Sequence, residues 1–396
     1  MRAFESLQFK NYRDFWTGQL VSLTGSWMQM IAMGWLVYDL TSSKLLLGLI
    51  NGIAGIPVLL LMPIGGIFAD RMSKRKLMLF TQISFAALAF TIGLLISTGH
   101  ISFWNLAAIA FLMGIINAID VPANQAFVVE LVDRRVLGNA IALNSIAFNI
   151  ARVIGPAVAG YMIGLAGIEA CFYLNALSFF VLIFVLLHMK GDFSPKADLS
   201  KSMGYALSEG IRYILDNKKV LFSISLVAFT SLFIMPYAAL MPVFAKDILK
   251  VGAPGMGILM SFAGIGALIG AFMLAQYSAK IDLKTLILTS TLTLSATAIV
   301  FSVSTVFSFS CLMLMIMGWA VVSQAASINT FIQKEVPNEL RGRVMSFFSL
   351  FFLGFMPIGA FQAGIVAHFL GAPAALIIGG LICLIPAVPM ALYLKK

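Results

Sequence analysis

The sequence consists largely of apolar segments, each long enough to cross a lipid bilayer as a helix. A transmembrane helix needs about 20 mostly apolar residues, and the seams between the segments carry Gly, Pro, Ser or charged residues, as in DLTSS and VGAPG. The spans that we predict lie near residues 13–38, 45–69, 76–98, 102–127, 138–164, 168–189, 220–245, 254–278, 283–303, 307–331, 343–368 and 372–393. The sequence therefore predicts an all-α membrane protein with twelve transmembrane helices.

The composition excludes a soluble enzyme. Hydrophobic residues make up 61% of the 396 residues and charged residues only 11%, whereas a soluble domain averages about 45–50% and about 25%. A membrane-embedded enzyme would need paired carboxylates, a His–acid metal set or a nucleophile constellation within the spans, and the sequence offers none. We expect no enzymatic activity, no metal site and no cofactor.

The net charge of +10 concerns topology rather than an acidic partner. A basic excess in a soluble protein suggests nucleic acid, but in membrane proteins Lys and Arg collect on the cytoplasmic side. With the N-terminus inside, 22 of the 26 basic residues lie in cytoplasmic segments, three lie on the opposite side, and Arg152 lies within a span. We therefore expect a multi-pass protein of the cytoplasmic (inner) membrane with both termini cytoplasmic and no nucleic-acid partner.

The chain is predicted to contain two related halves. GLINGIAGIP (48–57) aligns with GILMSFAGIG (257–266), and NQAFVVELVDRR (124–135) aligns with NTFIQKEVPNEL (329–340). Parallel repeats of this kind are typical of transporters with a binding site between the halves. We expect an N-terminal six-helix bundle (1–189), a polar cytoplasmic linker with an amphipathic helix (190–219) and a C-terminal six-helix bundle (220–396).

The junction of the second and third spans carries a recognisable motif, GGIFADRMSKRK (65–76), called the loop motif below. It resembles the G-x-x-x-D-R-x-x-[RK]-[RK] signature of the major facilitator superfamily. The resemblance implies two pseudo-symmetric six-helix bundles and a cytoplasmic gate, in which the loop latches against the start of the eleventh span. The gate residues would be Gly66, Asp70, Arg71, Lys74, Arg75, Arg341 and Arg343. The alternative is a basic turn that serves topology alone.

Two further segments, 120–145 and 333–346, resemble the drug and siderophore exporters that include the enterobactin exporter and macrolide efflux proteins. In the fifth span, Gly155, Pro156 and Gly160 are similar to the antiporter signature G-P-x-x-G-G, with either a gating or a packing role. The resemblance implies a secondary active exporter of an amphipathic small molecule (a drug, macrolide or siderophore) that works by alternating access. Alternatives on the same fold are a lysophospholipid flippase and a solute or metal uptake transporter.

Proton antiport is the expected energy source, because the sequence has no nucleotide-binding motif such as GxxxxGK[ST]. Asp120, in the fourth span, is the candidate coupling group, with a structural acid of the gate as the alternative. Arg152 lies deep in the fifth span, where a charge should face a cavity or a partner. It would anchor an anionic substrate, act as a gating switch, or pair structurally with Asp120, Asn149 or a carbonyl.

Polar and aromatic side chains within the spans mark candidate cavity faces, although single polar residues more often bond neighbouring helices. In this superfamily spans 1, 4, 7 and 10 line the cavity. The candidates for substrate contact, besides Arg152, are Gln19, Gln29, Asn51, Asn117, Asn149, Tyr237, Trp319 and Gln324. The expected partners are a small-molecule substrate, protons and the lipid bilayer, and we expect the protein to be a monomer.

Overall fold

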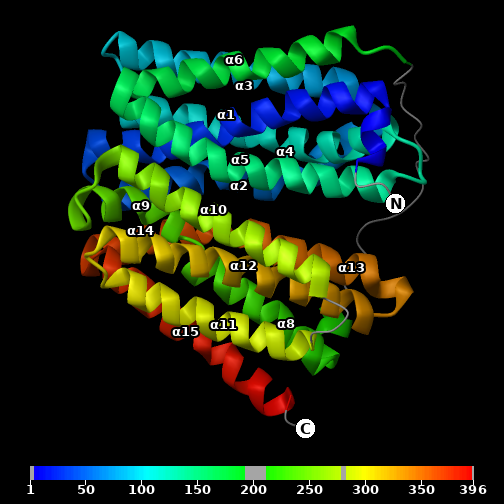
Figure 1. The fold of residues 1–396 in the computed structure, drawn as a ribbon, viewed down its shortest axis with the longest axis vertical. Coiled ribbons are helices and arrows are strands. Elements are labelled where there is room, and N and C mark those ends of the chain that lie inside the picture. The colour runs from blue at the N-terminus through cyan, green and yellow to red at the C-terminus, as the bar shows by residue number, and fades with distance from the viewer. Residues whose placement is uncertain (1–3, 192–210, 278–281, 395–396) are drawn as a thin grey trace. The chain divides into compact units, whose positions relative to one another are not determined.

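The computed structural model describes residues 4–191, 211–277 and 282–394, and every regular element in these ranges is helical (Figure 1). Within the described residues, twelve helical spans are long and apolar enough to cross a membrane. The predicted all-α membrane fold is therefore confirmed, and the spans extend a few residues beyond several of the predicted limits.

The helices follow one another with short connections. Six spans make up the first half: α1 (Lys10–Thr41), α2 (Lys44–Arg71), α3 (Lys74–Ser97), α4 (Phe103–Leu131), α5 (Leu137–Ala166) and α6 (Ile168–His188). In the second half the continuous spans are α10 (Gly252–Tyr277), α11 (Leu283–Ser302), α12 (Phe307–Glu335) and α15 (Ala372–Leu394). A short 3-10 helix, η1 (Glu5–Gln8), precedes α1. Of the predicted linker, residues 192–210 lie outside the described residues, and residues 211–216 are helical.

The seventh and eleventh spans contain π-helical segments. The seventh runs through α8 (Lys218–Phe229), η2 (Thr230–Ile234), α9 (Tyr237–Val243) and η3 (Phe244–Ile248), and the eleventh through α13 (Asn338–Ser349), η4 (Leu350–Gly354) and α14 (Phe355–Leu370). A π-turn disrupts the regular backbone ladder and often marks a functional site. Here Ser231 in η2 donates a hydrogen bond to the carbonyl of Phe352 in η4 at 2.9 Å, so the two irregular segments are joined to each other.

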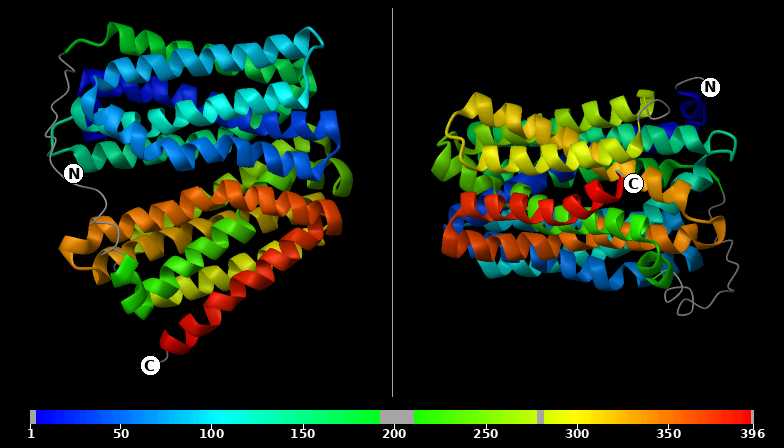
Figure 2. Two further views of the ribbon diagram at one scale, coloured as in Figure 1. Left: turned by 180° about the vertical axis from the view of Figure 1, so that it is seen from behind. Right: turned by 90° about the horizontal axis from the view of Figure 1, so that it is seen from below.

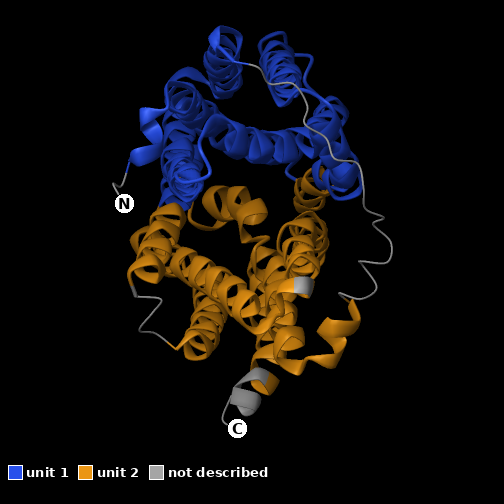
Figure 3. Cartoon of the chain, turned by 90° about the vertical axis from the view of Figure 1, so that its right-hand side faces the viewer, with its two compact units in different colours: residues 1–42, 53–198, 252–261 blue, residues 43–52, 199–251, 262–396 orange. Residues whose placement is uncertain are grey.

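The described chain divides into two compact units (Figure 3). Unit 1 contains residues 1–42, 53–198 and 252–261, and unit 2 contains residues 43–52, 199–251 and 262–396. The first turns of α2 thus belong with unit 2, and the first turns of α10 belong with unit 1.

Within unit 1, α3 runs beside α6, and α1 packs against both α5 and α6 (Figures 1 and 2). Tyr12 of α1 donates a hydrogen bond to the carbonyl of Ala140 at 2.8 Å, and the indole of Trp16 donates to the carbonyl of Leu143 at 2.9 Å. Within unit 2, α11 packs against α12 and α15. These contacts bury the apolar faces that the length and hydropathy of the spans predict.

The internal repeat is present in the limits of the helices and in the turns that follow them. α4 and α12 begin at Phe103 and Phe307 and end at Leu131 and Glu335, a constant offset of 204 residues. The turns after α5 and α14 use Gly167 and Gly371, at the same offset, with φ angles of 87° and 92°. Such positive φ angles are readily adopted only by glycine.

Candidate functional site

Asp120 of α4 is the centre of a polar network that joins three helices of unit 1. Its Oδ1 accepts a hydrogen bond from the hydroxyl of Thr81 at 2.5 Å and another from the amide of Gln82 at 3.0 Å, both on α3. The Oε1 of Gln82 in turn accepts from Ser22 of α1 at 3.3 Å. Ser22, Thr81 and Gln82 are buried and Asp120 is partly exposed, so the network fixes the carboxyl where α1, α3 and α4 meet.

Asp120 has no basic partner among the described residues. The ion pairs of the described chain do not include it, and its two hydrogen-bond donors are neutral. Ionisable side chains inside membrane helices usually pair with one another or with backbone groups. Within the described residues, the carboxyl of Asp120 is therefore held by neutral donors alone.

Thr81 can satisfy Asp120 in both protonation states. Its hydroxyl lies 3.0 Å from the carbonyl oxygen of Met78 and 2.5 Å from Asp120 Oδ1, and a hydroxyl has one proton to donate and two lone pairs. It donates to the carboxylate when Asp120 is ionised. When Asp120 is protonated, Thr81 can accept from the carboxyl and donate to Met78 instead.

The corresponding position in unit 2 is neutral. By the offset of 204 residues between the helix limits, Gln324 of α12 is the equivalent of Asp120 of α4. The amide of Gln324 donates a hydrogen bond to the hydroxyl of Thr291 on α11 at 2.7 Å. Gln324 is buried, with 1% of its surface exposed. A neutral side chain therefore suffices to join these two helices, and helix packing does not explain the charge of Asp120.

Arg152 of α5 forms a second charged feature of unit 1. Its guanidinium carbon lies 5.9 Å from the centroid of the Trp27 ring on α1, a cation–π contact. Trp27 is itself held edge-on by Phe148, with ring centroids 5.5 Å apart. No described residue gives Arg152 an ion pair or a hydrogen bond, so the predicted pairing with Asp120 or Asn149 is not formed in this structure.

The glycines of the fifth span shape this feature and its surroundings. A Cβ at Gly155 would lie 2.5 Å from the Cβ of Trp27, so only glycine allows α1 to come so close to α5. Gly160 lies against α10, because a Cβ on Gly257 would come within 3.0 Å of the Cα of Gly160 and 2.3 Å of the carbonyl of Pro156. The predicted helix-five motif thus provides close packing on two sides.

Two basic residues of the loop motif, Lys74 and Arg75, bind to other helices of unit 1. Lys74 is buried and its Nζ lies 2.8 Å from Oε1 of Glu130 at the end of α4. Arg75 donates hydrogen bonds to the carbonyls of Leu186 and Leu187 at the end of α6, at 2.6 and 2.8 Å. A cation at a helix C-terminus satisfies unpaired carbonyls and the helix dipole. The loop motif therefore fastens α3 to both α4 and α6.

The other predicted gate residues are accessible. Asp70 and Arg71 are exposed at the end of α2, and Arg341 and Arg343 are partly exposed on α13. The side-chain nitrogen Nε of Arg341 is buried and has no hydrogen-bond partner among the described residues. Gly66 faces open space, whereas a Cβ on its neighbour Gly65 would lie 1.9 Å from the carbonyl oxygen of Ala118 on α4.

We expect Lys74→Ala to lower the free energy of unfolding by about 2 kcal/mol. Removing one member of a buried ion pair costs about 3–5 kcal/mol and an exposed pair contributes about 0–1 kcal/mol; the Glu130 side chain is 26% exposed, which places this pair between the two. Thermal unfolding of the purified protein measures the loss. Lys76→Ala, at an exposed neighbour of the same loop, is the matched control and should be nearly neutral. Equal stability of the two variants would contradict the role of the Lys74–Glu130 pair.

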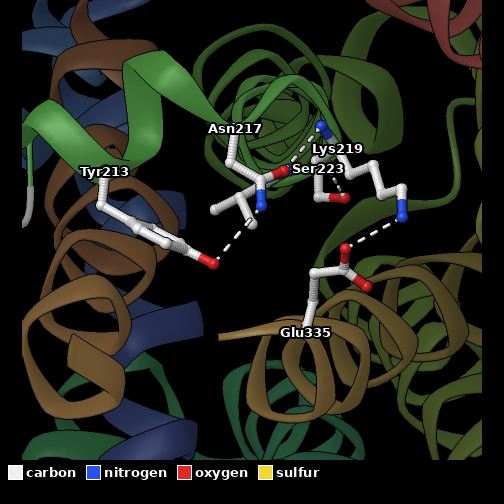
Figure 4. Close-up of polar contacts among 6 residues, drawn as sticks. Tyr213, Asn217, Lys219, Ser223 and Glu335 are labelled. Atoms are coloured by element: carbon white, nitrogen blue, oxygen red, sulfur yellow. Dashed lines mark hydrogen bonds and ion pairs between the residues drawn. The ribbon is translucent and has the colours of Figure 1, made fainter. Parts of the chain in front are cut away.

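Unit 2 has a polar cleft of about 640 Å³ at the start of α8 (Figure 4). Lys219 Nζ forms an ion pair with Glu335 Oε1 of α12 at 2.9 Å, and the side chain of Asn217 accepts hydrogen bonds from the backbone of Lys219 and Val220. Asn217 also donates to the hydroxyl of Tyr213 at 3.3 Å. These groups satisfy one another, so we assign the cleft to anchoring α8 on α12.

The predicted cavity residues fall into two groups. Gln29, Tyr237 and Gln324 are buried within their units. Gln29 accepts a hydrogen bond from Asn175 of α6 at 2.6 Å, which gives it a packing role in this structure. The partly exposed candidates are Gln19, Asn51, Asn117, Asn149, Arg152 and Trp319. The Oε1 of Gln19, one helical turn from Ser22, is buried and has no hydrogen-bond donor among the described residues.

Three members of the Asp120 network, Ser22, Thr81 and Gln82, were not predicted as site residues. A signal for two of them exists in the sequence, because Thr81 and Gln82 are adjacent polar residues in the apolar third span. The sequence repeat of 124–135 and 329–340 has an offset of 205 residues and would relate Asp120 to Ala325; the helix limits, with an offset of 204, are what relate it to Gln324.

The fold is that of secondary transporters. The solved structure of the nucleoside transporter NupG matches this chain with a TM-score of 0.76 over 98% of this chain and 99% of that chain, at 14% sequence identity. The chain belongs to the transmembrane secretion effector family of the major facilitator superfamily, whose sequence profile matches residues 1–395.

Curated relatives agree with this assignment. A staphyloferrin A transporter of Staphylococcus aureus is 27% identical over 367 residues, covering 90% of this chain and 89% of the relative. Macrolide efflux protein A of Streptococcus pyogenes is 23% identical over 407 residues, covering 100% and 99%. The predicted resemblance to siderophore and macrolide transporters is confirmed, and the family and these relatives are transporters.

Proposed function

We propose that this transporter exports an amphipathic small molecule in exchange for protons, and that Asp120 is the group that binds the proton. The observation that carries the proposal is the difference between the two repeats. Asp120 and Gln324 occupy equivalent positions and each bonds to the preceding helix, but only Asp120 can ionise.

Proton binding at Asp120 changes the charge inside unit 1. An ionised Asp at the centre of a membrane helix costs about 2.5–3.5 kcal/mol on insertion scales. Protonation removes this charge, and the Thr81 hydroxyl can reverse its hydrogen bond to suit the neutral acid. Two protonation states that are each satisfied locally can favour two arrangements of the bundles, which alternating access requires.

We place both termini on the cytoplasmic side of the inner membrane and assign residues 1–189 and 220–396 to two six-helix bundles. We assign the exposed Asp70 and Arg71, together with Arg341 and Arg343, to a cytoplasmic gate. A monomer suffices for this cycle. The names of the relatives, a siderophore transporter and a macrolide efflux protein, suggest a substrate with an apolar body and polar groups.

Transport by the wild-type protein in liposomes tests this proposal. Vesicles with an acidic lumen and a neutral exterior are supplied with radiolabelled erythromycin or staphyloferrin A outside. We expect at least one compound to accumulate in the lumen above its level in protein-free liposomes only while the pH gradient persists, and a protonophore to abolish this excess. Saturable uptake of either compound that ignores the pH gradient would overturn proton antiport.

A further inference from the structure

We infer that Arg152 and the face of Trp27 form the subsite that binds an anionic group of the transported molecule, and that the substrate class is an amphipathic carboxylate. The inference rests on the proposed function, since it specifies the molecule that is exported. It concerns a different pair of residues from the proton site.

The guanidinium of Arg152 has no hydrogen-bond acceptor among the described residues. A guanidinium carries five N–H donors in one plane and matches a carboxylate with two parallel hydrogen bonds. The guanidinium carbon lies over the Trp27 ring, 5.9 Å from its centroid, and no described residue offers the guanidinium a hydrogen-bond acceptor. The contact with the indole therefore positions the cation, while its N–H groups have no acceptor among the described residues.

The position of Arg152 makes an unpartnered charge costly. It lies near the middle of α5, which runs from Leu137 to Ala166, and an Arg at the centre of a membrane helix costs about 2.5–3.5 kcal/mol on insertion scales. A carboxylate bound at this point neutralises the charge. Binding an anion removes the free-energy cost of the unpaired charge, so the site favours an anionic ligand over a neutral one.

Arg152 lies on a face of α5 that packs against protein. Residues four apart lie on the same side of a helix, and the stripe of Arg152, Pro156 and Gly160 continues onto the surface that contacts Gly257 of α10. The hydroxyl of Ser261, where the unit 1 part of α10 ends, donates to the carbonyl of Val153 at 2.8 Å. Arg152 thus lies on the protein-facing stripe of α5, next in sequence to the residue that Ser261 contacts.

The side chain of Trp27 is held in place by its neighbours. Gly155 permits the close approach of α1, and Phe148 holds the indole edge-on at an interplanar angle of 71°. An indole oriented in this way offers apolar surface beside the cation. A ligand with a carboxylate next to an apolar or aromatic body matches both components.

Equilibrium binding to the purified full-length protein in zwitterionic nanodiscs tests the inference. The probes are 11-(dansylamino)undecanoic acid and its methyl ester, which differ only in the charge of one end, and empty nanodiscs correct for partition into lipid. We expect the wild type to bind the acid about tenfold more tightly than the ester, because a charge-assisted bidentate pair contributes on the order of 1.4 kcal/mol beyond a neutral contact.

Variants test whether the preference for the acid over the ester comes from Arg152 and Trp27. Arg152→Gln should bind acid and ester equally, Arg152→Lys should keep a reduced preference because a point charge remains, and Lys76→Gln should behave as the wild type. Trp27→Leu should weaken binding of both probes. A wild type without preference for the acid would overturn the inference. So would an unchanged preference in Arg152→Gln or, should that variant not fold, an undiminished preference in Arg152→Lys.

The binding test is independent of the proposed coupling, since it uses no pH gradient. Preference for the acid without proton-driven transport would defeat only the proposed antiport. Proton-driven transport without any preference for the acid would defeat only the assignment of Arg152.

Discussion

Asp120→Asn is expected to abolish pH-driven accumulation of substrate. A gradient of about 1.5 pH units can support at most about 30-fold accumulation for each proton exchanged, since one pH unit corresponds to a factor of ten. An asparagine side chain cannot bind the proton, so the ratio should fall to about one. Its amide still has a carbonyl oxygen that can accept from Thr81 and Gln82, so the fold and the exchange of labelled for unlabelled substrate should persist.

Asp133→Asn is the matched control for this prediction. Asp133 is also an acid of unit 1, but it is exposed and lies 3.8 Å from Arg135. Its replacement should leave pH-driven accumulation unchanged. Undiminished accumulation in Asp120→Asn would show that the proton binds elsewhere, and loss of substrate exchange as well would show that Asp120 serves the structure or the substrate rather than the proton.

Gly65→Ala is expected to destabilise unit 1 strongly. The added Cβ would lie 1.9 Å from the carbonyl oxygen of Ala118 and 3.1 Å from the Cα of Ile119, so α2 and α4 would have to move apart along their backbones. Overpacking of this kind costs about 1–3 kcal/mol or more, and we expect a loss of about 3 kcal/mol in thermal unfolding experiments. Because Ile119 precedes Asp120, pH-driven accumulation should also fall.

The control for Gly65→Ala is its direct neighbour in the loop motif. A Cβ on Gly66 would meet nothing within 4 Å, and alanine is favoured over glycine in a helix by about 1 kcal/mol. Gly66→Ala should therefore be neutral or slightly stabilising. Similar melting temperatures for the two variants would contradict the close contact of α2 with α4 at Gly65.

The two glycines show how far the loop motif could be interpreted from sequence. The motif indicates that two helices meet at this junction and that glycine matters there. The motif predicts Gly66 as the gate glycine, whereas the crowded position in this structure is Gly65. A shift of one residue turns a side chain by about 100° around a helix, so the direction depends on where the neighbouring helix lies.

The same distinction applies to the charged residues. The sequence identifies Asp120 and Arg152 as unusual because a charge within an apolar span is costly wherever it points. It leaves their mutual pairing open. The structure gives Asp120 the donors Thr81 and Gln82 and gives Arg152 the indole of Trp27, and each partner lies far away in sequence.

The sequence by itself determined the membrane class, the number of spans and the internal repeat. These properties follow from hydropathy and spacing, which each segment carries locally because a bilayer requires a fixed length of apolar helix. Only the tertiary structure decided which polar groups meet, that Gln324 is a neutral counterpart bonded to Thr291, and that Lys74 pairs with Glu130. Which side chains meet depends on how each helix is rotated and shifted against its neighbours. Contacts between different segments set that rotation and shift, so the sequence of one segment does not determine them.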